Sequence, residues 1–154
     1  FRSPLEAEWR RIHRGKHHAP PTEHPPRAVR AAVGRCATKT RSDALTTTIN
    51  AYGSTLRWGD FQSAAQFIDP AIRAAHPLSK LDLARYKQVK VSDYDNGAGP
   101  VPVDDFDVQQ TVQISVVNIH TQSERSIVDH QTWHYDEKTK HWWLTSGLPD
   151  ITQD

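Results

Sequence analysis

The sequence predicts an α+β domain over residues 41–154, with helices first and a curved antiparallel sheet of about four strands after them. Apolar residues recur every three or four positions at the start of this range, which is typical of amphipathic helices. From about Tyr86 they recur at every second position, which is typical of strands with one buried face. Because the helices precede the strands, we expect them to cover one face of the sheet.

Charge divides the chain of 154 residues into two parts. Residues 1–40 carry nine Lys/Arg and three Asp/Glu, whereas residues 41–154 carry ten and fifteen. The first part also holds five of the ten Pro and four of the nine His, with sparse apolar residues. It is predicted to be a disordered arm or linker, and residues 41–154 a single domain. A basic arm can attract nucleic acid or anionic lipid, but Pro and His dilute this charge, so we expect no nucleic-acid partner.

Two helices and further short helical turns are expected before the sheet. Ser42 or Asp43 is predicted to cap the first helix, and Gly59 to end it. Asp60 is predicted to cap the second, and Pro70 to open a short turn, with another over residues 79–83. The buried face of the first helix is predicted to consist of Leu45, Ile49, Tyr52 and Leu56.

The strands are expected to begin at about residues 86, 106, 125 and 141. Residues 136–140 form a hairpin loop of four or five residues in this prediction. Within the second strand the apolar phase slips by one position after Val116, which predicts a β-bulge near Val116–Val117.

The C-terminal segment Trp142-Trp143-Leu144-Thr145-Ser146-Gly147-Leu148-Pro149, with this order of elements, resembles the cystatin-like cone fold of nuclear transport factor 2-like domains. It is similar in particular to small bacterial envelope proteins of that group. The fold hosts isomerases, dehydratases, immunity-type proteins and binding modules, so the resemblance implies no single activity. It does imply that the sheet could support a homodimer.

Cys36 is the single cysteine, which excludes an intrachain disulfide and a cysteine zinc cluster. The segment from Ala31 to Thr40 resembles the junction of a bacterial lipoprotein, which implies acylation of Cys36, a polar tether and a lipid anchor at the periplasmic face of the cell envelope. Arg35 and the lack of a preceding apolar segment depart from that pattern. The alternative is an unmodified thiol on a cytoplasmic protein. No stretch approaches the roughly 20 apolar residues of a membrane helix.

Histidines and carboxylates on the predicted hairpin are the candidates for acid–base or metal chemistry. Asp129, His130, His134 and His141 lie on its two strands, but consecutive residues such as Asp129 and His130 point to opposite faces. Solvated strand histidines are the favoured interpretation, and the arm's His13, His17, His18 and His24 offer no fixed metal geometry. We assign no catalytic, cofactor-binding or metal residue. In the cone fold, however, Asp93 or Asp129 with Tyr52, Tyr86, Tyr94 or Tyr135 could line a cavity.

An aromatic concentration in the terminal hairpin is the strongest indication of a site. Trp133, Tyr135, Trp142 and Trp143 are predicted to contact a ligand or partner, because neighbouring Trp142 and Trp143 cannot both face the core. The expected function is a non-enzymatic binding or interaction module for a small hydrophobic ligand or a protein. The alternative is a small cavity enzyme, an isomerase or dehydratase acting on a hydrophobic substrate.

Overall fold

The computed structural model describes residues 28–152, with side chains from residue 37 onward. The first helix, α1, spans Ala28–Trp58 and is followed by α2 (Phe61–Ala64), the 3₁₀-helix η2 (Ala65–Phe67), α3 (Pro70–Ala75) and α4 (Lys80–Tyr86). The strands are β1 (Val89–Asp95), β2 (Val101–Pro102), β3 (Asp107–Asn118), β4 (Glu124–Asp136) and β5 (His141–Leu144). The α+β order predicted from the sequence is confirmed.

The predicted start of the first helix is wrong. Ser42 and Asp43 do not cap it, because the backbone is already helical from Ala28, within the predicted arm. The segment after Cys36, predicted to be a polar tether, is helical as well. Its Ala, Lys and Arg residues favour helix. The threonines that follow are accommodated because their hydroxyls donate to the carbonyl four residues earlier, as Thr46 does to Ser42 at 3.1 Å and Thr47 to Asp43 at 2.9 Å.

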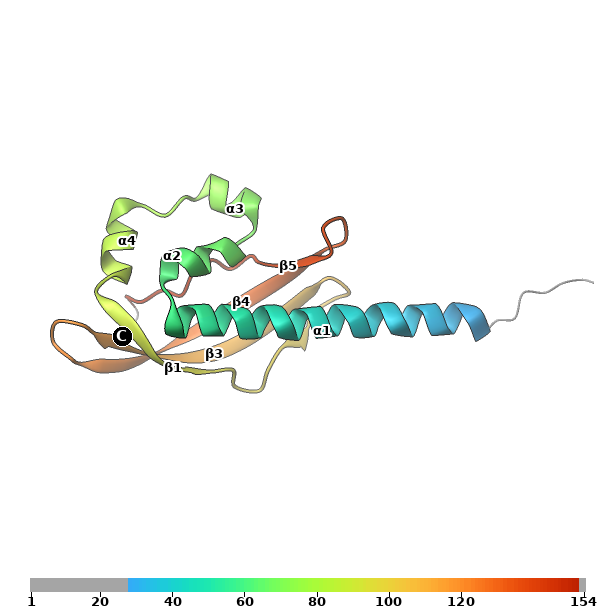
Figure 1. The fold of residues 1–154 in the computed structure, drawn as a ribbon, viewed down its shortest axis with the longest axis horizontal. Helices are drawn as coiled ribbons and strands as arrows, with labels where there is room; N and C mark the ends of the chain where they lie inside the picture. The colour runs from blue at the N-terminus through green and yellow to red at the C-terminus, as the bar shows by residue number, and fades with distance from the viewer. Residues whose placement is uncertain (1–27, 153–154) are drawn as a thin grey trace, which may run out of the picture. The chain divides into compact units, whose positions relative to one another are not determined.

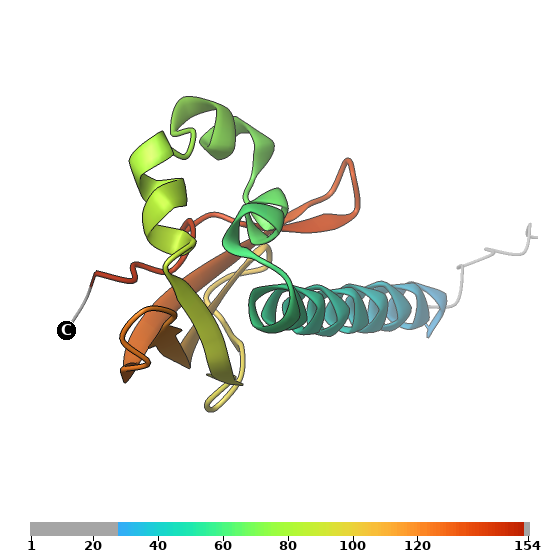
Figure 2. The ribbon, with the colours of Figure 1, turned by 60° about the vertical axis from the view of Figure 1, so that its left-hand side comes forward.

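Three short α-helices, α2, α3 and α4, lie between α1 and the sheet, and each begins at a side chain that accepts a backbone hydrogen bond. Asp60 accepts from the Ser63 N–H at 2.6 Å, as predicted. Asp69 accepts from the Ala71 N–H at 2.8 Å, and Pro70 opens α3. Ser79 and Asp82 form a reciprocal capping box at α4. The three helices follow one another in an arc (Figure 2).

The sheet is antiparallel with the order β1-β3-β4-β5, and β2 pairs with the start of β3. It is strongly curled, and the helices lie on its concave side (Figure 1). Tyr135 pairs with Trp142 and Asp136 with His141, so the β4–β5 loop contains four residues, 137–140. Ile68 also bridges to Leu144, which attaches the segment after η2 to β5.

The predicted bulge lies on a different strand. Val116 and Val117 pair regularly with Arg125 and Glu124 on β4. The extra residue is Ser92 on neighbouring β1, since Val91 pairs with Val116 and Asp93 with Ser115. The apolar slip in β3 instead marks the end of its buried face, because Val117 is half-buried and Ile119 is exposed.

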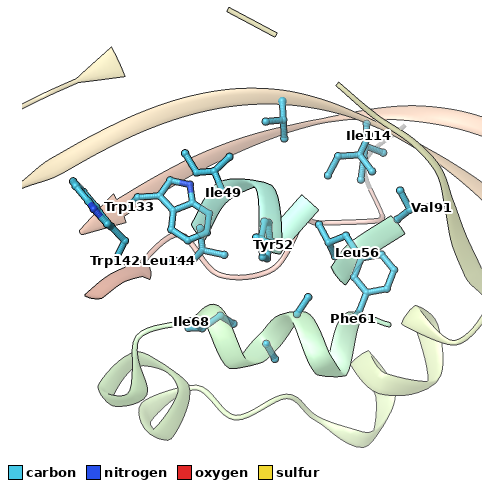
Figure 3. Packing of buried hydrophobic residues seen from close by; sticks show 14 of the residues in the cluster. Ile49, Tyr52, Leu56, Phe61, Ile68, Val91, Ile114, Trp133, Trp142 and Leu144 are labelled. Atoms are coloured by element: carbon cyan, nitrogen blue, oxygen red, sulfur yellow. The ribbon is translucent and has the colours of Figure 1, made fainter. Parts of the chain in front are cut away.

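The core lies between α1, α2 and the concave face of the sheet, as the labelled side chains show (Figure 3). The predicted stripe of α1 is buried there, and the fully buried Tyr52 ring packs edge-on against Trp133 with 5.4 Å between centroids. Gly53 follows Tyr52, and a Cβ atom at this position would lie 2.8 Å from Cε1 of Tyr94. The absent side chain therefore lets the Tyr94 ring lie directly against α1.

Over residues 28–152, no helix has both the length and the apolar composition that crossing a membrane would require.

Candidate functional site

The predicted aromatic group is divided between the two faces of the sheet. Trp133, Tyr135 and Trp142 are buried on the concave face. Both indole N–H groups there have acceptors: Trp133 donates to Gln131 at 3.3 Å and Trp142 to the carbonyl of Arg41 at 3.0 Å. Trp143 is half-buried on the convex face, with its ring 4.3 Å from that of His141. Of these four side chains, Trp143 is therefore the one placed to meet a partner without disturbing the core.

The predicted histidines lie on the convex face of the sheet, His130 and His134 on β4 and His141 on β5, and do not meet Asp129. His134 Nδ1 lies 2.8 Å from Asp107 Oδ1, and His130 Nδ1 lies 3.1 Å from the hydroxyl of Thr111. Neighbouring positions of β4 point to opposite sides, so the Asp129–His130 pair is separated as expected. In the described part of the chain, no three His, Cys, Asp or Glu residues are grouped to hold a metal ion. His13, His17, His18 and His24 lie outside the described residues.

Asp129 is part of a polar group in the core that sequence reasoning only partly anticipated. Its Oδ2 accepts from Gln131 Nε2 at 2.9 Å, and the same amide donates to the Tyr94 hydroxyl at 3.0 Å. Burial raises the pKa of the Asp129 carboxyl, against the opposing effects of the Gln131 hydrogen bond and of His130. Burial also raises the pKa of Tyr94 to about 12. The buried Tyr52 hydroxyl has no hydrogen-bond partner.

A cavity with a volume of about 550 Å³ lies elsewhere, where the end of α1 meets α2, α4 and β1. This volume falls within the roughly 300–1,000 Å³ usual for small-molecule sites. Phe61 and Tyr86 stack there with their rings 4.4 Å apart and nearly parallel. Figure 3 shows Leu56, Phe61 and Val91 converging from α1, α2 and β1. The apolar and aromatic side chains lining this cavity are Leu56, Trp58, Phe61, Leu83, Tyr86, Val89 and Val91.

Three cations and one carboxylate also line this cavity: Arg57, Lys87, Lys90 and Asp60. Hydrogen bonds from Ser63 lower the pKa of the Asp60 carboxyl, and Lys87 adds a smaller effect in the same direction. The Asp60 carboxylate is already engaged as the cap of α2, so the available charge at the cavity is positive.

Trp58 is the functional candidate that sequence reasoning missed. It is 78% exposed, the highest value among the large hydrophobic residues described, and its ring lies 5.2 Å from the guanidinium carbon of Arg57. The available signal was its position two residues after Leu56, which places it off the buried stripe of α1. Trp58 is the last residue of α1 and lines the cavity, so its exposed ring is available to a ligand there.

A second, smaller cavity of about 210 Å³ lies between α1 and β1 and shares Arg57 and Trp58 with the first. Its other lining residues are Ile49, Asn50, Gly53, Ser54, Tyr94 and Asn96. Arg57 is the charged residue in this lining, and the hydrogen-bonding side chains beside it, such as Asn50, Ser54 and Asn96, are neutral. We refer to the two spaces as the apolar cavity and the polar recess.

Cys36 lies in the part of α1 whose side chains the structure does not describe, so its acylation stays a prediction. Comparison of the chain with known protein families and with curated proteins found no match to either.

Proposed function

We propose that this protein is a non-enzymatic binding module whose apolar cavity takes a small ligand with a hydrophobic body. The observation that supports this most directly is the apolar floor formed by Leu56, Phe61 and Val91 beside an exposed Trp58. Filling such a space removes apolar surface from water, which is the main favourable contribution to binding.

The residues of the apolar cavity favour binding over catalysis. The carboxylate in its lining, Asp60, is held by Ser63, and the lining includes no His, Cys, Ser or Thr. The alternative is a small cavity enzyme, an isomerase or dehydratase on a hydrophobic substrate. It is favoured by Asp129, whose pKa burial raises as expected for an acid–base group. Asp129 does not line the apolar cavity, so binding is the better-supported proposal.

Three wider parts of the proposal rest on sequence resemblance. We propose that the domain belongs to the cystatin-like, nuclear transport factor 2-like group, which the helices on a curled antiparallel sheet support. A lipid anchor at Cys36 would hold it at the cell envelope. The convex face of the sheet, which includes Trp143 and the exposed Val128, is the proposed homodimer surface.

Binding of an environment-sensitive naphthalene sulfonate dye tests the apolar cavity. The native chain should enhance the dye's fluorescence saturably, and Leu83→Asp should weaken binding at least tenfold because it places a carboxylate in the apolar lining. Leu81→Asp is the matched control, since Leu81 is exposed on the same helix and outside the lining. Equal binding by the native chain and both variants would contradict the proposal.

A further inference from the structure

The polar recess adds a second, chemically different compartment to the proposed binding site. The apolar cavity has hydrophobic walls, whereas the recess presents Asn50, Ser54 and Asn96. Arg57 and Trp58 line both spaces, so the two are adjacent and the exposed indole stands at their boundary. A ligand that used both would need an apolar end and a polar end.

Arg57 determines the charge expected at the polar end. Its guanidinium lies 4.0 Å from the Asp93 carboxylate, and both side chains are substantially exposed. Ion pairs of this kind contribute little, so Asp93 does not compete strongly with an incoming anion. A guanidinium can bind a planar carboxylate through two parallel hydrogen bonds. Asp93 does not bind Arg57 in this way, because its carboxylate lies at 4.0 Å, the limit of an ion pair.

The same neighbourhood favours a single negative charge over two. Asp93 stays close to the guanidinium and would repel a phosphate dianion more than a carboxylate monoanion. The recess offers one cation and several neutral groups, which matches the hydrogen-bonding needs of one carboxylate. Lys87 and Lys90 line the apolar cavity but not the recess, whereas Arg57 lines both, so Arg57 is the cation next to the polar groups.

We propose that the ligand is a single-chain amphipathic carboxylate, with its hydrocarbon body in the apolar cavity and its carboxylate on Arg57 at the polar recess. This inference rests on the proposed binding function, and it adds the ligand class and the anchoring residue.

Calorimetric titration of the full chain with decanoate, decyl phosphate and 1-decanol tests the inference. The native protein should bind decanoate about tenfold more tightly than 1-decanol, which corresponds to about 1.4 kcal/mol, and more tightly than decyl phosphate. Arg57→Gln should retain 1-decanol binding and lose the preference for decanoate. Lys87→Gln, which removes a cation that lines only the apolar cavity, should keep that preference. Ser54→Leu, which fills part of the recess, should reduce it as well.

The outcomes separate the two proposals. Equal affinity of the native protein for decanoate and 1-decanol would overturn the carboxylate inference and leave the binding function standing. If Arg57→Gln kept the preference for decanoate and Lys87→Gln lost it, the carboxylate would bind Lys87 rather than Arg57. This result would also overturn the carboxylate inference. If none of the three probes binds, both proposals fail. Circular dichroism of each variant confirms that it is folded before titration.

Discussion

At the scale of single residues, Asp129 is a carboxyl group that the fold holds partly away from water. Its pKa is raised in the folded protein by burial, so folding disfavours the charged form. The energetic cost is complete when the pH is above the raised pKa, and it disappears as the pH falls below the ordinary value of the unfolded chain. Tyr52, Tyr86 and Tyr94, which interact electrostatically with Asp129, remain protonated because burial raises each pKa.

Asp129→Asn should therefore increase the free energy of unfolding at pH 7, because it removes the buried charge and keeps an oxygen that can accept from Gln131. The difference from the native chain should shrink as the pH is lowered from 7 to about 3.5, because the carboxyl then gains a proton in a growing fraction of folded and unfolded chains. Urea denaturation at both pH values measures this. Asp43→Asn, at an exposed site on α1, serves as the control and should show no such change. A less stable Asp129→Asn at pH 7 would mean that the carboxylate makes a favourable interaction.

At the scale of elements, Asp69 connects two parts of the fold. Its backbone N–H donates to the Leu144 carbonyl at 3.0 Å, and its side chain caps α3 through Ala71 and Ile72. Asp69→Ala should lower the free energy of unfolding by about 1 kcal/mol. Asp69→Asn should lower it much less, because an Asn side chain can also cap the helix. Equal losses in the two variants, measured by urea denaturation, would show that charge at the helix start matters more than the hydrogen bond.

The elements differ in how far their sequences determine them. The buried stripe of α1 and the alternating pattern of β3 predicted the correct faces, because side-chain spacing reports burial directly. The predicted start of α1 was wrong. Ser42 and Asp43 are residue types that often cap helices, but the residues before them include good helix formers, and the helix extends through them to Ala28. The bulge was assigned to the wrong strand because pairing involves two strands. A phase slip in β3 does not identify Ser92 of β1 as the extra residue.

At the scale of the whole molecule, the terminal hairpin contains three tryptophans with different surroundings. Trp133 and Trp142 are buried in the core, whereas Trp143 is half-buried on the convex face. Trp133→Ala should cost roughly 3–5 kcal/mol because it leaves a large void beside Tyr52. Trp143→Ala should cost much less, since its ring lies on the convex face. Denaturation at several protein concentrations checks both. A large, concentration-dependent loss in Trp143→Ala would indicate that this ring is buried in a homodimer.

The candidate site could not be predicted from the sequence to the same extent as the fold. The sequence placed Tyr135 and Trp142 in one hairpin but left its loop at four or five residues, and the observed loop of four pairs these two residues. The apolar cavity, in contrast, depends on how α2 and α4 pack relative to β1 in the folded chain. Residues such as Phe61 and Leu83 give no local signal of that placement, because each also fits an ordinary amphipathic turn.

Gly53 helps to shape the polar recess, where the head group of the proposed ligand would bind. The ring of Tyr94 occupies the space that a side chain there would need, and both residues form walls of the recess. A methyl group added at position 53 would have to displace this ring, so the shape of the recess, and with it the size of head group that the proposed ligand could have, would change. Selection of ligands by size would then depend on a residue that has no side chain.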